Sequence, residues 1–269
     1  GVGLPAERLP MILGTDAAGI DESGNEVVVY GVIDADSGGD PLLSRQRSLL
    51  SELHPGTMAT WLAVPEGNLV AKPASVTFEQ AATLPTAWLT AYHMLARGGL
   101  SSGDAVLVQG AGGGVATAAI VLAAAAGARV YATSRSEAKR QRVRELGAVA
   151  LASGERLPER VDIVIETVGE ATFDHSLRSV KNGGRVVVSG ATSGNLPRVD
   201  LRQVFFRQVD ILGVTMGTKE ELVELLALVA SGRVRPVIDS TFPFEQAPKA
   251  FERLASGDAF GKVVLNHSS

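Results

Sequence analysis

The sequence predicts an α/β protein in which a parallel sheet is covered by helices on both faces. The first observation is a series of continuous apolar runs of strand length, such as Ala105–Gln109 and Asp162–Glu166. The second is that helical segments alternate strictly with these runs. The third is a glycine-rich turn, Gln109–Gly114, between one such run and the helix that follows it. A chain of 269 residues can form one large domain or two modest ones.

The N-terminal part, residues 1–75, has a β-rich pattern instead. Glu26–Ile33 is an apolar, β-branched run of strand length, and Met58–Pro65 and Leu69–Ala71 are shorter strand candidates. Between them, residues 34–55 are polar, and a loop of this length is usually functional or mobile.

The pattern changes to helix at Thr77. Thr77–Gln80 has the composition of a capping box, and a helix is expected over residues 78–97 with a break at Leu84–Pro85. The alternating region that follows predicts strands at 105–109, 129–133, 162–166, 185–189 and 210–214, and helices at 115–126, 137–146 and 218–231. After Pro236 we expect a strand (237–241), a helix (245–255) and a strand (262–265).

The glycine turn is the strongest local signal for a ligand. It follows a strand and opens a helix, which is the context that a dinucleotide-binding turn requires. Glycines let the backbone approach a pyrophosphate closely, and the helix N-terminus offers free N–H groups. Counted from Ala111, the frame keeps small residues at Gly113 and Ala116. The residues expected to contact the cofactor are Gly110, Gly112, Gly113, Gly114, Val115 and Ala116. A plain tight turn is the alternative.

The end of the second strand bears on which nicotinamide cofactor binds. An acid about twenty residues after the glycine turn would bind the ribose hydroxyls of NAD, and none stands at this strand tip. Ser134, Arg135 and Lys139 are suited to hold a 2′-phosphate instead, which favours NADPH over NADH. The alternative is that Ser134 caps the next helix in a capping box with Glu137 and that the bases are merely exposed.

Composition excludes several classes of function. The sequence has no cysteine, which excludes disulfides, thiolate metal sites and thiol nucleophiles and is compatible with the cytoplasm. A net charge of −4 provides no basic field for nucleic acid or an anionic membrane. The apolar stretch Val115–Ala132 is too short to span a bilayer, and no signal peptide pattern is visible. We expect a cytoplasmic protein with neither nucleic-acid nor membrane partners.

A set of motifs in a fixed order then resembles the medium-chain dehydrogenase/reductase superfamily, and most closely its zinc-free, quinone-oxidoreductase-like branch within the zinc-type alcohol dehydrogenase-like proteins. Each motif is weak alone, but together they cover the chain: Leu13–Gly19, Leu84–Tyr92, Gly110–Ala116, Arg144–Ala148, Glu166–Gly169, Gly183–Arg185, Ser189–Gly194 and Phe260–Lys262.

The resemblance implies a specific domain organisation. Residues 1–84 and 237–269 would form a GroES-like, β-rich catalytic domain, and residues 85–236 a Rossmann dinucleotide-binding domain with a doubly wound parallel sheet. The substrate cleft would lie between the two domains. Because the chain does not start with Met, we expect the catalytic domain to be incomplete at its N-terminal end. The last Rossmann strand, 210–214, would pair with its symmetry mate in a homodimer.

The resemblance also allows the family's metal ligands to be checked by position. Zinc-dependent members carry a His–Glu pair after the glycine that Gly14 matches, where this chain has Thr15 and Asp16. They also carry a cysteine near Thr86 and four cysteines in the lobe at 34–55, and both are lacking here. The four histidines are scattered without ligand spacing, at positions 54, 93, 175 and 267. We therefore expect no zinc and no other catalytic metal.

Without a metal, hydride transfer favours an intrinsically electrophilic acceptor. Quinones and α,β-unsaturated carbonyls fit, because the developing charge delocalises into a phenolate or an enolate. Thr15 and Asp16, which replace the metal ligands, are expected to contact the substrate. Tyr92 is a further candidate proton donor, although packing is an equally good interpretation. Trp88 is either a cleft wall or a core residue. Water and a residue of an N-terminal segment outside this sequence are the remaining alternatives for the acid.

By the same resemblance, the nicotinamide should lie along the carboxyl ends of the sheet strands. The residues there are Thr167, Val168, Gly190, Ala191, Thr192, Thr215 and Met216, with Lys262 (beside Gly261) reaching in from the C-terminal part. Turn formation is the alternative for Thr192 and Thr215, and an exposed base for Lys262.

The sequence thus predicts an NADPH-dependent oxidoreductase that transfers hydride to a quinone or an α,β-unsaturated carbonyl without a metal. A zinc-free alcohol dehydrogenase and a non-catalytic NADPH-binding sensor are the alternatives. A serine hydrolase is disfavoured, because the G-x-S-x-G match at Gly99–Gly103 follows an expected helix and precedes an expected strand, whereas a nucleophile elbow follows a strand and opens a helix.

Overall fold

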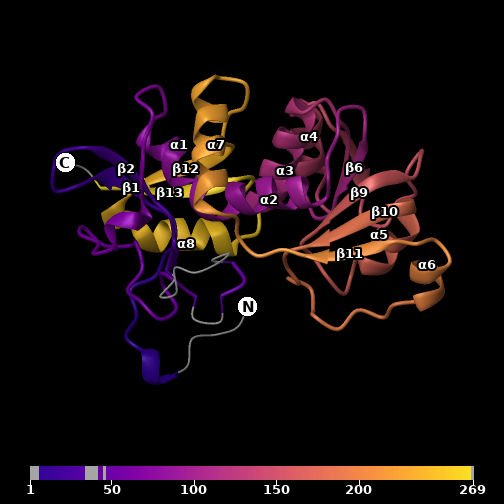
Figure 1. The fold of residues 1–269 in the computed structure, drawn as a ribbon, viewed down its shortest axis with the longest axis horizontal. Helices are drawn as coiled ribbons and strands as arrows, with labels where there is room; N and C mark the ends of the chain where they lie inside the picture. The colour runs from indigo at the N-terminus through magenta and orange to yellow at the C-terminus, as the bar shows by residue number, and fades with distance from the viewer. Residues whose placement is uncertain (1–5, 34–41, 45–46, 268–269) are drawn as a thin grey trace. The chain divides into compact units, whose positions relative to one another are not determined.

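The computed structural model describes residues 6–33, 42–44 and 47–267. It divides into two compact units (Figure 1). The first unit comprises Gly1–Leu89, Met216–Gly257 and Val263–Ser269, and the second comprises Thr90–Thr215 and Asp258–Lys262. Much of the long polar loop expected at 34–55 falls on residues 34–41 and 45–46, outside the described residues.

The second unit is built on a six-stranded sheet with the strand order β11-β10-β9-β6-β7-β8, and every neighbouring pair is parallel. The strands are β6 (Ala105–Val108), β7 (Arg129–Ser134), β8 (Val149–Ala152), β9 (Val161–Glu166), β10 (Val180–Val188) and β11 (Asp210–Gly213). The order reverses between β6 and β9, which is the switch point of a doubly wound sheet. The predicted Rossmann fold class is confirmed.

Helices connect these strands, as the alternation predicts. They are α2 (Leu89–Arg97), which leads into the sheet, and then α3 (Gly114–Ala125), α4 (Glu137–Glu145), α5 (Phe173–Ser179) and α6 (Leu201–Phe205). Strand β6 is completely buried because both faces of the sheet are covered, and this explains its uninterrupted apolar run. One side of the core gathers Leu107, Val164, Phe173 and Val186 in a single cluster.

The first unit contains the antiparallel strands predicted for the β-rich part. A three-stranded sheet has the order β1-β2-β5, and β3 with β4 and β12 with β13 form two-stranded sheets. Their bounds are β1 (Ala18–Ile20), β2 (Glu26–Val29), β3 (Val32–Ile33), β4 (Ser48–Leu49), β5 (Leu69–Ala71), β12 (Ile238–Pro243) and β13 (Lys262–Asn266). The helices are α1 (Phe78–Ala82), α7 (Lys219–Ala230) and α8 (Ala247–Ala255), with short turns η1 (Ala6–Arg8), η2 (Glu66–Asn68) and η4 (Phe244–Gln246).

The predicted helix start and break near residue 80 are both confirmed. Thr77 and Gln80 form the capping box with both reciprocal hydrogen bonds. The helix then changes to a π-helical turn, η3 (Leu84–Trp88), where Pro85 cannot donate a backbone hydrogen bond, and continues as α2.

Two strand predictions in the first unit need correction. The run 26–33 is split between β2 and β3, because Tyr30 N–H bonds to Asn68 and Gly31 accepts from Leu50. The strand expected at 58–65 is absent from the described structure. After Met58, whose N–H bonds to Leu13, the segment leaves its partner and runs along the surface, where Trp61 is 88% exposed.

The compact units differ from the predicted domains at α7, which packs with the first unit. Lys219 Nζ donates to the carbonyl of Gly67, and Ser75 Oγ donates to the carbonyl of Ala230, so both ends of this helix are tied to that unit. The bounds of the functional domains stay a prediction. No helix in the described part of the chain is long and apolar enough to cross a membrane.

Candidate functional site

The glycine turn lies where β6 meets α3, at the switch point of the sheet. Gly110 and Gly112 have φ angles of +71° and +130°, which favour glycine over residues with a side chain. A Cβ on Gly110 would stand only 2.4 Å from Val168 Cγ2. At Gly113, which precedes α3, an added Cβ would meet nothing within 4 Å. The turn is thus tightly packed below and open at the helix N-terminus, an arrangement suited to a pyrophosphate.

Lys139 crosses the glycine turn. A Cβ on Gly112 would lie 2.7 Å from Lys139 Cδ and 2.9 Å from Lys139 Nζ. This position comes from α4, whose N-cap is Ser136, since its Oγ accepts from the Lys139 N–H. The alternative in which Ser134 caps the helix is therefore wrong, because β7 continues through Ser134 and the helix starts later.

The tip of β7 carries several cations close together in the sequence. Arg135 is exposed, whereas Ser134 is buried and its carbonyl accepts from Arg140 Nη1 at 2.7 Å. The nearby acid, Glu137, pairs with Arg144 at 3.0 Å and with Arg140. Hydrogen bonds from Arg144 first, and then from Arg140, hold the pKa of Glu137 below its ordinary value. Arg140 is a residue that sequence reasoning missed.

Two further turns meet beside the glycine turn. The turn after β9, at Thr167–Gly169, bonds to the loop at 190–194, since Ser193 N–H donates to Val168 O at 2.8 Å. A Cβ on Gly190 would lie 2.9 Å from Thr167 O. The structure therefore brings together the predicted residues at these turns, which are Thr167, Val168, Gly190, Ala191 and Thr192, and Val168 contacts Gly110.

The segment at 258–262 also reaches the glycine turn. Gly261 N–H donates to Gly112 O at 2.9 Å, and the buried Phe260 ring packs under the Arg142 guanidinium at 4.9 Å. Lys262 is the next residue along the chain, and its contact with a cofactor stays a prediction.

For the other predicted residues, the structure gives their surroundings within their own units. Thr215 is exposed at the end of the second unit, and Met216 begins the first unit, buried at φ +54°. Thr15 and Asp16 belong to the first unit, where Thr15 Oγ1 donates to Leu50 O and the Asp16 carbonyl accepts from Thr57 Oγ1.

Tyr92 lies on α2 in the second unit and is partly exposed, so its grouping with Thr15 and Asp16 stays a prediction. Trp88, on the π-helical turn, is completely buried, which favours the core interpretation over a cleft wall.

The described residues contain no group of three or more His, Cys, Asp or Glu side chains able to hold a metal ion. Three of the histidines make other contacts. His54 Nε2 lies 2.8 Å from Ser48 Oγ, His267 stacks on Phe244, and His175 is bound in a buried network of the second unit. The donors present in the described part therefore do not fit a zinc site, whereas the glycine turn fits a nicotinamide dinucleotide.

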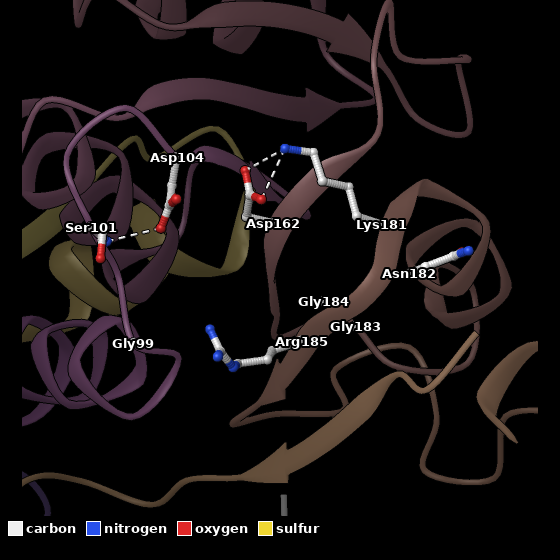
Figure 2. A pocket seen from close by; sticks show the side chains of 9 residues that line it. All are labelled: Gly99, Ser101, Asp104, Asp162, Lys181, Asn182, Gly183, Gly184 and Arg185. Atoms are coloured by element: carbon white, nitrogen blue, oxygen red, sulfur yellow. Dashed lines mark hydrogen bonds and ion pairs between the residues drawn. The ribbon is translucent and has the colours of Figure 1, made fainter. Parts of the chain in front are cut away.

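A polar pocket of about 330 Å³ lies at the amino ends of the sheet strands, at the other end of the strands from the glycine turn (Figure 2). Its charges are already satisfied: Lys181 Nζ lies 2.8 Å from both Asp162 oxygens, and Arg185 donates to Gly98 O. Partial burial works to raise the pKa of Asp162, but hydrogen bonds from Lys181 and the Ala105 N–H outweigh it and hold that pKa below its ordinary value. This pocket lies at the amino ends of the strands, away from the edge where doubly wound sheets bind ligands.

Comparison with known proteins agrees with this geometry. A family model described as zinc-binding dehydrogenase matches residues 137–265. The acryloyl-coenzyme A reductase of Metallosphaera sedula is 31% identical, over 97% of this chain and 85% of that protein. The chain belongs to the medium-chain dehydrogenase/reductase superfamily. It is therefore an NAD(P)H-dependent oxidoreductase of the zinc-type alcohol dehydrogenase-like group, and the predicted family is confirmed.

Two solved structures of this superfamily illustrate its range. An NAD-dependent alcohol dehydrogenase has a TM-score of 0.89 and 34% identity, over 98% of this chain and 84% of that one. A 2-octenoyl-CoA carboxylase reductase in complex with NADP and 2-octenoyl-CoA also has a TM-score of 0.89, with 27% identity, over 95% of this chain and 68% of that one.

Proposed function

We propose that this chain is an NADPH-dependent reductase that transfers hydride to an α,β-unsaturated carbonyl compound or a quinone without a catalytic metal. The observation that carries the proposal is the cation-rich glycine turn, where Lys139 crosses Gly112 and Arg135 is exposed at the tip of β7. These two cations suit a 2′-phosphate, and the one acid of that tip, Glu137, is already paired with arginines.

The residues divide the task of holding the cofactor. The turn from Gly110 to Ala116 would hold the pyrophosphate at the α3 N-terminus. The tip of β7, which includes Ser134, would hold the 2′-phosphate of the adenosine. The nicotinamide would lie along 167–168 and 190–192, with Thr215, Met216 and Lys262 completing its surroundings. When bound, the cofactor supplies a hydride to the electron-poor carbon of the substrate.

A conjugated acceptor suits a site without a metal. Hydride addition at the β-carbon moves the electron pair of the double bond to the carbonyl oxygen as an enolate, and a proton then adds to the α-carbon. Hydroxyl donors are sufficient to stabilise such a delocalised oxyanion. We propose Tyr92 as a donor to this oxygen and Thr15 and Asp16 as substrate contacts.

The relatives support enoyl substrates in particular. The Metallosphaera protein is named for acryloyl-coenzyme A, and one solved relative holds 2-octenoyl-CoA with NADP. The similarity to an NAD-dependent alcohol dehydrogenase keeps a zinc-free alcohol dehydrogenase as the second candidate, and a sensor without turnover as the third.

The decisive experiment is a fluorescence titration of the protein with NADPH and with NADH, followed by addition of acceptors. We expect tight NADPH binding and oxidation of NADPH by an alkenal, by crotonyl-CoA or by 9,10-phenanthrenequinone. Oxidation of a plain alcohol with NAD would favour the zinc-free alcohol dehydrogenase. Binding of NADPH without any turnover would favour the sensor. If neither nucleotide binds, the proposal is overturned.

The metal-free part of the proposal has its own test. Incubation with EDTA followed by gel filtration should leave the reductase rate unchanged, because the described residues gather no metal-ligand group. Loss of activity that zinc restores would contradict it.

We also propose a homodimer paired through β11, which lies at the edge of the described sheet with Ile211 44% exposed. Phe205 and Phe206, just before it, are 59% and 75% exposed. Ile211→Lys should convert a dimer to a monomer in sedimentation experiments, and a monomeric unaltered chain would refute the pairing.

The absence of cysteine supports a cytoplasmic location, which cell fractionation would test.

A further inference from the structure

A buried carboxylate stands at the end of β9, next to the switch point of the sheet. Glu166 is completely buried. Its oxygens accept hydrogen bonds from Val168 N–H (2.8 Å), Gly169 N–H (3.0 Å), Thr172 Oγ1 (2.9 Å) and Ser176 Oγ (2.6 Å). The donors are two backbone amides of the turn at 167–169 and two hydroxyls of the segment that follows. Burying such a group is costly unless it is fully hydrogen-bonded, so this arrangement calls for an explanation.

The hydrogen bonds continue from Ser176 to the glycine turn. Gln109, which is also completely buried, donates from Nε2 to Ser176 Oγ at 3.0 Å. The other amide atom, Oε1, accepts from Thr133 Oγ1 at 2.6 Å, and Thr133 Oγ1 accepts in turn from Gly110 N–H at 3.3 Å. One chain of hydrogen bonds therefore joins the first glycine of the turn to the amides at 168 and 169.

Donors and acceptors in this series of hydrogen bonds follow in a fixed order from Glu166 to Gly110. Ser176 donates its one proton to Glu166 and accepts from Gln109, which fixes the orientation of the Gln109 amide. Gln109 Oε1 then faces Thr133, whose single proton is used there, so the Thr133 oxygen is left to accept from Gly110. His175 contributes at the side, with Nδ1 2.8 Å from Gln109 Nε2 and Nε2 2.8 Å from Glu155 O.

This series of hydrogen bonds joins turns that all face the proposed cofactor site. Glu166 fixes the turn that places Val168 Cγ2 against Gly110, and the same turn bonds to the loop at 190–194. Thr133 fixes Gly110 from the other side. We infer that Glu166, Gln109 and Thr133 are positioning residues that set the glycine turn for cofactor binding, an inference that rests on the proposed function.

The sharpest test removes one link without changing its shape. Thr133→Val keeps the β-branched outline at a buried position but deletes the hydroxyl that holds both Gly110 and Gln109. Thr133→Ser restores that hydroxyl. The matched control is Asp162→Asn, which removes a hydrogen-bonded carboxylate at the other end of the same strand as Glu166 (Figure 2). Ser176→Ala interrupts the chain at a second point, in case Thr133→Val fails to fold.

The measurements are the NADPH dissociation constant, the KM for NADPH, kcat and the melting temperature, all on the full chain. We expect Thr133→Val and Ser176→Ala to raise the NADPH dissociation constant and KM about tenfold with a much smaller change in kcat. Thr133→Ser should bind within about twofold of the unaltered chain. Asp162→Asn should lower only the melting temperature.

Two outcomes distinguish this inference from the proposed function. If the unaltered chain binds neither NADPH nor NADH, the proposed function and the inference both fall. If it binds NADPH while Thr133→Val and Ser176→Ala lower the melting temperature without changing that affinity, the hydrogen bonds are purely structural and the inference alone is overturned.

Discussion

The backbone N–H of Gly261 donates a 2.9 Å hydrogen bond to the carbonyl oxygen of Gly112, so a turn close to the C-terminus is fastened to the glycine turn. Both residues belong to the second unit, although most of the neighbouring C-terminal sequence belongs to the first. The bond also explains how Lys262 is held close to the proposed pyrophosphate position.

This contact predicts that Gly261→Ala weakens NADPH binding. Gly261 has a φ of +101°, which an alanine adopts only with strain of about 1–3 kcal/mol, so the substituted segment should shift away from Gly112. Gly257→Ala is the matched control, because Gly257 also has a positive φ (+74°) but an added Cβ there meets nothing within 4 Å. Isothermal titration should show weaker NADPH binding for Gly261→Ala only, and equal affinity in the two variants would refute the role of the bond.

The preference for NADPH should depend on Arg135 and Lys139. Arg135→Glu places a carboxylate at the tip of β7, which should repel the 2′-phosphate and bind the ribose hydroxyls of NADH, so that the preference reverses. Lys139→Met should raise the NADPH dissociation constant about tenfold and change that of NADH much less.

The control for these variants is Arg178→Met, which removes a cation that pairs with Asp174 on the exposed face of α5. Fluorescence titration of each variant with both nucleotides checks the prediction. A loss of NADH affinity as large as the loss of NADPH affinity would assign the two cations to the pyrophosphate instead.

A surface cluster of the second unit predicts a specific loss of stability in acid. Hydrogen bonds from Arg129, and then from Tyr131, lower the pKa of Glu159 from 4.5 to about 2. A carboxyl whose pKa is lowered in the folded state stabilises the protein above the unfolded pKa and loses that contribution as the pH falls through the folded value. The contribution of Glu159 should therefore be complete above about pH 5 and mostly lost near pH 2.

Glu159→Gln makes this measurable. The difference in melting temperature between the unaltered chain and this variant should be constant at neutral pH and shrink as the pH falls toward 2. Because both partners of the pair are more than a third exposed, at 53% and 37%, added salt should also reduce the difference. A difference that does not change between these pH values would show that the Arg129–Glu159 pair contributes nothing to stability.

Hydrophobic patterning was sufficient to predict the sheet of the second unit, with one exception. Strands such as β6 are buried on both faces and therefore appear in the sequence as unbroken apolar runs. Strand β8 was missed because Val149 is 51% exposed and two of its four residues are alanines. Strand β4, with two residues, is defined only by pairing with β3, and such long-range pairing leaves no local pattern.

The candidate site likewise has one part that the sequence predicts and one part that it does not. The glycine turn was predictable because positive φ angles and close packing require glycine at Gly110 and Gly112, and the sequence shows this directly. The network of Gln109, Thr133 and Glu166 was not predictable, because each stands at the end of a strand where a polar residue is ordinary. Gln109 and His175 are 66 positions apart, so only the folded sheet brings them into contact.

Lys72 provides a prediction about the first unit that is independent of the cofactor. Its side chain is only 3% exposed, and Nζ lies 2.8 Å from Glu26 Oε2 and donates to the carbonyls of Val76 and Pro73. The ammonium also lies 4.9 Å from the centre of the Phe78 ring, so one cation ties β2 and β5 to the start of α1.

Lys72→Met keeps the length of the side chain but leaves those two carbonyls without their donor. We expect the free energy of unfolding in urea to fall by about 1–3 kcal/mol, because buried acceptors lose their hydrogen bonds and the removed charge was paired. Lys249→Met, which removes an exposed cation of α8 hydrogen-bonded only weakly to Gln246 at 3.3 Å, should change it by less than about 0.5 kcal/mol. Equal effects of the two substitutions on the free energy of unfolding would mean that water replaces Lys72 at these carbonyls. The affinity for NADPH should be unchanged in both variants, because neither residue belongs to the second unit.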